Sequence, residues 1–193
     1  LVNINNWKIK NTFLLYLDEK KSSIVNKIFE NSCKAKEFLD VSQGIIPYSK
    51  ENHSIETIKN RSFHSKKKLS EEYGIWIQGK VINRYSINFD NLEYLRYGKW
   101  LHRPREIKYF NRPRILIQEI TGGDPPRISA TKYEDVLYHD PGIISCLNIS
   151  TYNINYLLAI INSKLISWYH STTSPKGKRR IFPKILINDI REL

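Results

Sequence analysis

The sequence predicts an α+β fold, in which a mixed or antiparallel sheet is packed by a few helices. Short alternating runs typical of strands fill the middle of the chain, turns rich in glycine and proline separate them, and an amphipathic helical pattern follows. The chain has 193 residues, of which 40% are hydrophobic. That is enough for one domain with a buried core that needs no disulfide.

The first part of the chain predicts a short N-terminal segment followed by a helix. Residues 1–17 alternate weakly, as an edge strand does. Ser22 or Ser23 can cap a helix whose apolar residues recur at helical spacing. We therefore divide the chain into an N-terminal segment with a short helix, residues 1–36, and a main domain, residues 37–193.

Strand patterns dominate the main domain as far as residue 150. Gly44 interrupts the first of them, and the polar, basic stretch 50–70 predicts a loop or a loosely held helix. A turn at 122–126 indicates that the strands on either side of it form a hairpin. The expected strands are residues 38–46, 74–85, 114–120, 127–130 and 142–150.

The clearest helical pattern covers residues 151–170, where polar residues interrupt an apolar stripe. A basic loop, 174–180, follows it, and residues 181–189 predict a short terminal strand. The helix should therefore pack inside the fold, and the segment after it should reach the edge of the sheet. Its expected apolar face consists of Ile154, Leu157, Leu158, Ile161, Leu165 and Trp168.

The net charge of +12 favours a polyanionic partner, of which nucleic acid is the commonest. An acidic protein partner is the alternative. Cys33 and Cys146 have apolar neighbours and are expected to be buried, reduced thiols. The sequence has no signal peptide and no apolar run that could span a bilayer, so we expect no membrane partner and a location in the bacterial cytoplasm. Because it begins at Leu1 and lacks methionine, we expect a segment of a larger protein.

Three basic clusters are interleaved with aromatic residues in expected loops. Lys and Arg can hold phosphates, and Arg can also read guanine edges. A solvated loop surface is the alternative for each cluster. Among the candidates, Tyr97, His102, Arg103 and Arg105 are the expected base readers, and Lys178, Arg179 and Arg180 the expected phosphate or base contacts. The expected DNA-binding residues are Arg61, His64, Lys66, Lys67, Lys68, Tyr97, Lys99, His102, Arg103, Arg105, Lys176, Lys178, Arg179 and Arg180.

Motifs for chemistry are weak in this sequence, and we expect no catalytic, cofactor-binding or metal-binding residues. The histidines and cysteines lack ligand spacing, and no glycine-rich nucleotide turn or nucleophile elbow is present. The string Asp124-Pro125-Pro126-Arg127 has Arg where adenine methyltransferases need a stacking aromatic, so we interpret it as a turn. Glu19 and Lys21 have nuclease-like spacing without a matching upstream aspartate.

An ordered set of strings extends over residues 38–193 and resembles the TaqI-like C-terminal specificity domain. That family is the target-recognition part of adenine-specific DNA methyltransferases and fused type II restriction–modification enzymes, and it is similar to type I specificity subunits. The strings are SQGIIPYSK, YLRYGKWLHRPREIKYFNRPRILIQEIT, RISAT, YLLAIINSKLISWYH and FPKILINDIREL.

The resemblance implies a fold like that of a target-recognition domain, with double-stranded DNA as partner. It also implies a catalytic domain on the same polypeptide, which would bind S-adenosylmethionine and flip the adenine. By this interpretation the chain alone is not an enzyme, although its parent would methylate DNA and could also cleave it. A recognition domain of a type I subunit and a stand-alone metal-dependent nuclease are the alternatives.

Overall fold

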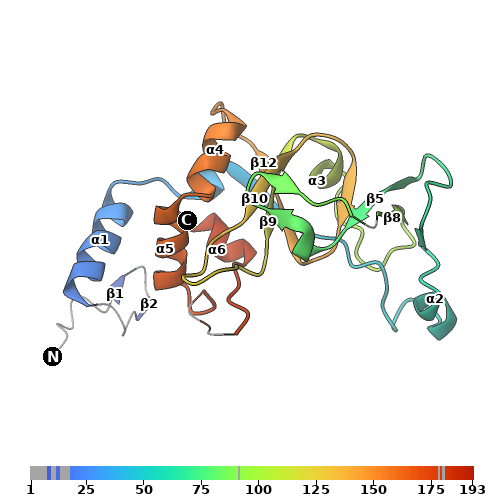
Figure 1. Cartoon of the computed structure of the whole chain (residues 1–193), viewed down its shortest axis with the longest axis horizontal. Helices are drawn as coiled ribbons and strands as arrows, with labels where there is room; N and C mark the ends of the chain where they lie inside the picture. Colours follow the sequence, from blue (N-terminus) through green and yellow to red (C-terminus); the bar gives the residue numbers. More distant parts are fainter. Residues whose placement is uncertain (1–7, 10–11, 14–17, 91, 178, 180) are drawn as a thin grey trace.

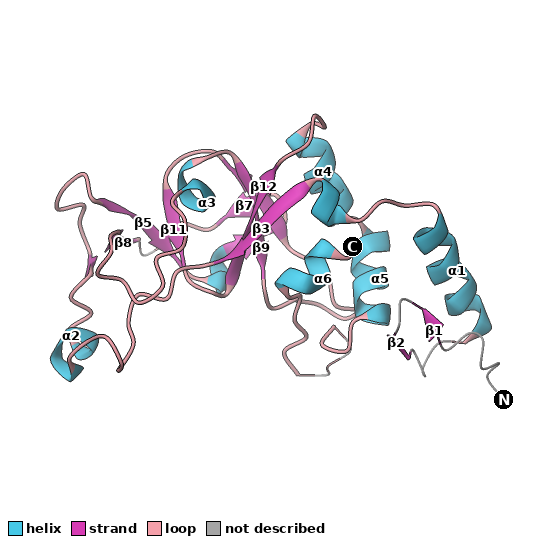
Figure 2. Ribbon diagram, turned by 180° about the vertical axis from the view of Figure 1, so that it is seen from behind, coloured by secondary structure: helices cyan, strands magenta, loops and turns pink. Residues whose placement is uncertain are grey.

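The computed structural model describes residues 8–9, 12–13, 18–90, 92–177, 179 and 181–193. It has an α+β fold with antiparallel and mixed sheets, which confirms the predicted class. Figures 1 and 2 show an elongated molecule with a body, which contains the helices α4, α5 and α6, and a smaller lobe at one end. Helix α1 lies at the opposite end of the molecule from the lobe.

The body is built on an antiparallel sheet with strand order β10-β9-β12-β3. Its central strand β12 is apolar along most of its length and pairs with strands on both sides, which places Cys146 opposite Ile115 and Val41. The helices α4, α5 and α6 cover one face of this sheet, and their apolar residues form the main core with it. The strands are β3 (Leu39–Gln43), β9 (Arg114–Gln118), β10 (Ala130–Tyr133) and β12 (Ile143–Asn148). The helices are α1 (Glu19–Glu30), α4 (Ile154–Ile161), α5 (Lys164–Thr173) and α6 (Ile187–Arg191).

The lobe contains a mixed sheet of order β11-β5-β8-β4, in which only the β11–β5 pair is parallel. A cluster of buried residues joins this sheet to the body, with Ile77 and Leu137 from the lobe against Leu116 and Ile143 from β9 and β12. The lobe strands are β4 (His64–Ser65), β5 (Tyr73–Ile77), β8 (Glu93–Arg96) and β11 (Leu137–His139). The smaller elements are β1 (Lys8–Ile9), β2 (Thr12–Phe13), β6 (Ile82–Asn83), β7 (Ser86–Ile87), α2 (Ile55–Lys59), α3 (Lys108–Asn111) and the 3-10 turns Ala35–Glu37 and Gly79–Val81.

The long helix expected at 151–170 is two helices, because Asn162 and Ser163 end one and begin the next. The Asn162 side chain exchanges two hydrogen bonds with the Ala130 backbone, at 3.0 and 2.9 Å, and the Ser163 hydroxyl accepts from Ile166 N to cap α5. The break changes which side chains face the core. Leu165, expected on the apolar face, is 53% exposed, so that part of the prediction was wrong.

The terminal strand expected at 181–189 is also wrong. Lys184 makes only an isolated bridge with Ile120, and the chain then enters α6. Pro183 has no N–H to donate to a sheet ladder, and the Asp189 carboxylate accepts from Leu186 N at 2.8 Å, which caps a helix instead.

Three smaller expectations also differ from the structure. Asp18, rather than Ser22 or Ser23, caps the first helix, because its carboxylate accepts from Lys21 N at 2.8 Å. The second hairpin strand begins at Ala130 rather than ending there. Cys33 is exposed, whereas Cys146 is buried as expected.

His139 should make the stability of the fold depend on pH. It is fully buried, with Nε2 2.7 Å from the Ser145 hydroxyl, and burial lowers its pKa to about 3. Below pH ~6.5 the imidazole is therefore protonated in the unfolded chain but stays neutral in the folded chain. The contribution of His139 to the free energy of unfolding is full above that pH and decreases as the pH falls. We expect urea unfolding to give a free energy about 2 kcal/mol lower at pH 5 than at pH 7.5 from this group. His139→Gln should flatten the profile; an unchanged pH dependence in that variant would contradict the assignment.

Candidate nucleic-acid interface

A loop at residues 97–105 of the lobe is held by hydrogen bonds within itself, to strand β8 and to the segment that follows β3. The Tyr97 hydroxyl donates to Arg105 O at 2.7 Å, and Arg103 exchanges backbone hydrogen bonds with Ile46 at 2.9 and 3.1 Å. The Trp100 indole donates to Arg96 O at 3.0 Å. These contacts fix the backbone of the loop while the Arg103 side chain remains exposed.

Glu93 pairs with two of the predicted cationic contacts. Its carboxylate accepts two hydrogen bonds from Arg61, at 2.9 and 2.8 Å, and one from Lys66 at 3.1 Å. The Arg61 hydrogen bonds hold the pKa of Glu93 below its usual range, and Lys66 adds to this effect. The network joins the residues on both sides of β4 to Glu93 of strand β8, so these two cations also stabilise the fold of the lobe.

Three other cations in the same region have no ion-pair partner among the described residues. Lys68 is paired with Glu71 at 2.8 Å, but no ion pair involves Lys67, Lys99 or Arg103. All three of these side chains are exposed. Their charge is therefore available to an external anion without breaking an internal contact.

His64 and Tyr97 are half-buried, and both contact other side chains of the lobe. His64 Nδ1 is 2.8 Å from the Tyr48 hydroxyl, and its ring meets Trp76 edge-on at 5.2 Å. Burial lowers the pKa of His64 to about 4, so its ring is neutral at pH 7. Tyr97 stacks on Tyr138 at 5.1 Å, and burial raises its pKa. Their contacts are with the protein, and a role for them at DNA stays a prediction.

His102 and Arg105 frame the exposed Arg103. His102 Nδ1 lies 2.9 Å from the amide oxygen of Asn52, an exposed residue that the sequence reasoning missed. Arg105 has a left-handed backbone, with φ 63°, and its Nε donates to Gly44 O at 3.3 Å. Asn52 is fifty positions from His102 along the chain, so no local pattern could have joined the two.

The third basic cluster lies on the loop between α5 and α6. Lys176 and Arg179 are exposed there, whereas Lys178 and Arg180 lie outside the described residues. The loop borders an open cavity of about 790 Å³ beside the β9–β10 turn. Within the described part of the chain, no hydrogen bond, ion pair or ring contact joins this cluster to the other two.

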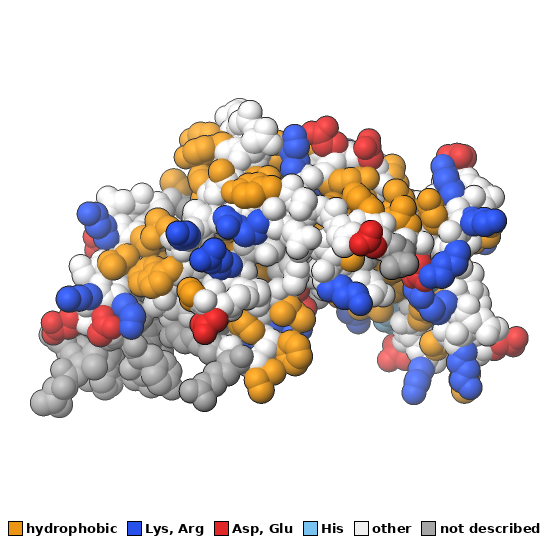
Figure 3. Space-filling view, viewed as in Figure 1, with side chains coloured by type: hydrophobic (Ala, Val, Ile, Leu, Met, Phe, Trp, Pro, Cys, Tyr) orange, Lys and Arg blue, Asp and Glu red, His pale blue; other side chains and the backbone are white. Residues whose placement is uncertain are grey.

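The structure thus brings the first two clusters together on the lobe and leaves the third on the body. In Figures 1 and 2 the α5–α6 loop and the α2 end of the lobe both extend toward the lower side of the molecule. Figure 3 shows the outline recessed between these two parts, with Lys and Arg dense over the lobe and mixed with Asp and Glu.

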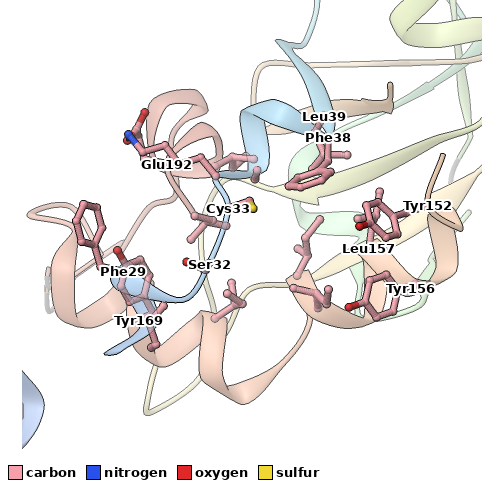
Figure 4. Close-up of a pocket in the computed structure, with 18 residues that line it drawn as sticks. Phe29, Ser32, Cys33, Phe38, Leu39, Tyr152, Tyr156, Leu157, Tyr169 and Glu192 are labelled. Carbon is pink, nitrogen blue, oxygen red and sulfur yellow. The ribbon is translucent and has the colours of Figure 1, made fainter. Parts of the chain in front are cut away.

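An apolar cavity of about 380 Å³ lies at the other end of the body, among α1, α4, α5 and α6. Figure 4 shows the rings of Phe38, Tyr152 and Tyr156 along its wall. Its lining is mostly apolar, unlike the cationic loops. Across the described residues, no group of three or more His, Cys, Asp or Glu side chains could hold a metal ion. No helix in the described ranges is long and apolar enough to cross a bilayer.

Comparison with known proteins gives one family. The profile of the TaqI-like C-terminal specificity domain matches residues 75–193. No curated protein matches the chain.

Two solved structures overlap most of the chain at low identity. One is a chain from a study of the assembly and conformational transition of a type I restriction–modification system, with 16% identity, a TM-score of 0.47, and coverage of 83% of this chain and 32% of that chain. The other is the HsdS subunit from Thermoanaerobacter tengcongensis, with 15% identity, a TM-score of 0.47, and coverage of 83% and 31%. This chain therefore spans about a third of the length of these proteins.

Proposed function

Because this chain belongs to the family of TaqI-like C-terminal specificity domains, we propose that it reads the DNA target of an adenine-specific DNA methyltransferase or fused type II restriction–modification enzyme. Membership of this family directly supports DNA recognition within a restriction–modification system. The adenine specificity and the type II assignment rest on the resemblance alone. Methyl transfer would be carried out by a domain outside this chain, which would also bind S-adenosylmethionine.

One observation carries the proposal: a loop fixed to the body presents an exposed arginine that has no acidic partner in the described chain. Ile46 holds Arg103 through its backbone, and the adjacent His102 is hydrogen-bonded with Asn52. Arg supplies a two-pronged donor for guanine, and an amide beside it can read a neighbouring base edge. Lys67 and Lys99 would hold flanking phosphates and fix the register without reading sequence.

The proposal is tested by enriching a random duplex library on the intact 193-residue chain. We expect a short preferred sequence after several rounds at moderate salt, because fixed side chains select base edges. If the bound duplexes remained random in sequence, the chain would contact phosphates only, and the proposal that it reads sequence would be contradicted.

Arg103→Ala should weaken binding to the preferred duplex and relax the choice of base at one position. Loss of a bidentate contact to guanine is expected to cost about 1–3 kcal/mol of binding free energy. Lys20→Ala is the matched control, because it removes the same charge from an exposed site on α1, at the far end from the lobe. Fluorescence anisotropy with the preferred duplex, labelled, gives the affinity of both variants. Equal affinities for the two variants would remove Arg103 from the interface.

A separate test concerns the proposal that catalysis belongs to another domain. Titration of S-adenosylmethionine into the chain in a calorimeter should give no binding heat, and plasmid incubated with the chain and Mg²⁺ should stay supercoiled. Binding of the methyl donor, or nicking that depends on the metal, would favour an enzyme site within this chain instead.

A further inference from the structure

The loop between α5 and α6 is closed at its base and fixed to the body. Lys184 N donates to Lys176 O at 3.2 Å, which joins the two sides of the loop. Thr121 donates to Pro183 O from both its backbone N, at 2.9 Å, and its hydroxyl, at 3.2 Å. Ile185, two residues after Pro183, is fully buried. The base of the loop is therefore held at a defined place on the body.

The loop presents two adjacent apolar side chains to solvent. Ile181 is 75% exposed and Phe182 64%, and Ile181 has the largest exposed fraction of any large hydrophobic residue in the described chain. Phe182 also adopts a left-handed backbone, with φ 52°, which is unfavourable for an aromatic residue. Covering this tip would remove apolar surface from water, which stabilises a complex in proportion to the area.

The surroundings of the tip are cationic. Lys176 and Arg179 are exposed on the same loop, and Arg127 is exposed on the β9–β10 turn. None of the three has an ion-pair partner among the described residues. Asp124 contributes one carboxylate to the cavity that the loop borders, and Glu119 is occupied by Lys184 at 3.0 Å. The partner that covers the tip must therefore offer an apolar slot flanked by negative charge.

A base-pair step of duplex DNA has this chemistry, because its stacked faces are apolar and phosphates lie on both sides. We propose that Ile181 and Phe182 form a wedge that enters between base pairs of the bound duplex, while Lys176 and Arg179 hold the adjacent phosphates. Apolar wedges of this kind partly unstack a base step and kink the duplex. The inference rests on the proposed function, since it requires that the chain binds DNA.

The test uses a duplex in which 2-aminopurine replaces adenine at several steps, so that unstacking raises its fluorescence. The intact chain at saturating concentration should increase the signal about twofold or more. Ile181→Ala combined with Phe182→Ala should bind within about threefold of the original affinity but lose the increase. Phe182→Leu, which keeps an apolar wedge, should retain it. Ile149→Ala is the matched control, because Ile149 is 60% exposed outside this loop, and it should behave like the unaltered chain.

The outcomes separate the wedge from the proposed function. Binding by the unaltered chain with no rise in fluorescence would overturn the wedge and leave DNA recognition intact. A full rise in the double alanine variant would overturn it as well, and would leave the tip free for a protein partner. Failure of the unaltered chain to bind any duplex would overturn both. Because the tip is exposed, the unfolding midpoint of the variants should match that of the unaltered chain.

Discussion

Gly44→Ala is expected to prevent the chain from folding stably. An alanine Cβ at this position would lie 1.9 Å from the Asp140 carbonyl oxygen and 2.6 Å from that of His139. Both atoms belong to backbone, and Ile45 N donates to His139 O at 2.9 Å, so this crossing of body and lobe cannot widen without losing a buried hydrogen bond. We expect a loss of more than about 3 kcal/mol, at the upper end for overpacked sites.

The control for this prediction is Gly122→Ala, where an added Cβ would meet nothing within 4 Å. Its free energy of unfolding should stay within about 1 kcal/mol of the original. Urea unfolding followed by circular dichroism measures both variants. Equal midpoints for the two would show that the close crossing at Gly44 does not exist.

Arg114→Met is expected to have the second largest effect. Arg114 is completely buried and has no carboxylate partner in the described chain. Its guanidinium instead donates to three backbone carbonyls, those of Arg112 at 2.7 Å, Asp135 at 3.0 Å and Leu137 at 3.0 Å. Burial lowers its pKa to about 10, so it remains charged at pH 7. Methionine fills much of the same space but leaves the three carbonyls without donors, at an expected cost of about 3–5 kcal/mol.

Arg112→Met provides the comparison, because Arg112 is exposed and only its backbone takes part in this network. The free energy of unfolding of that variant should stay within about 0.5 kcal/mol of the original. If the two variants unfolded at the same urea concentration, the carbonyl network would contribute nothing to stability.

Periodicity predicted the elements best where burial decides the pattern. The strand at Ile143–Asn148 was expected because four of its six residues are apolar, as is typical of a strand buried on both faces. Residues 151–170 were predicted as one helix because the pattern continues across Asn162 and Ser163. The break depends on the backbone of Ala130, a partner thirty-two residues away, which local sequence does not reveal.

Charge patterns located the candidate site, but they did not reveal which of its cations are paired with carboxylates inside the protein. Arg61, Lys67 and Arg103 look alike in sequence, and only the fold shows that Glu93 neutralises Arg61 and leaves the other two free. Such pairing depends on strand register, here the placement of the β4 segment beside β8. Ile181 and Phe182 were expected in a short terminal strand, whereas both are exposed on the α5–α6 loop, because an apolar run alone does not reveal exposure.

The central claim is that unpaired cations on the lobe and the α5–α6 loop bind a DNA duplex. The most direct test is to measure the Kd for a duplex at increasing salt concentrations. We expect log Kd to rise with log salt at a slope of about 3 or more, because several phosphates would be neutralised. Alanine at Lys67, Lys99, Arg103 and Lys176 together should abolish most of that slope. A Kd that does not change with salt, or a slope that survives the four substitutions, would contradict DNA binding by this surface.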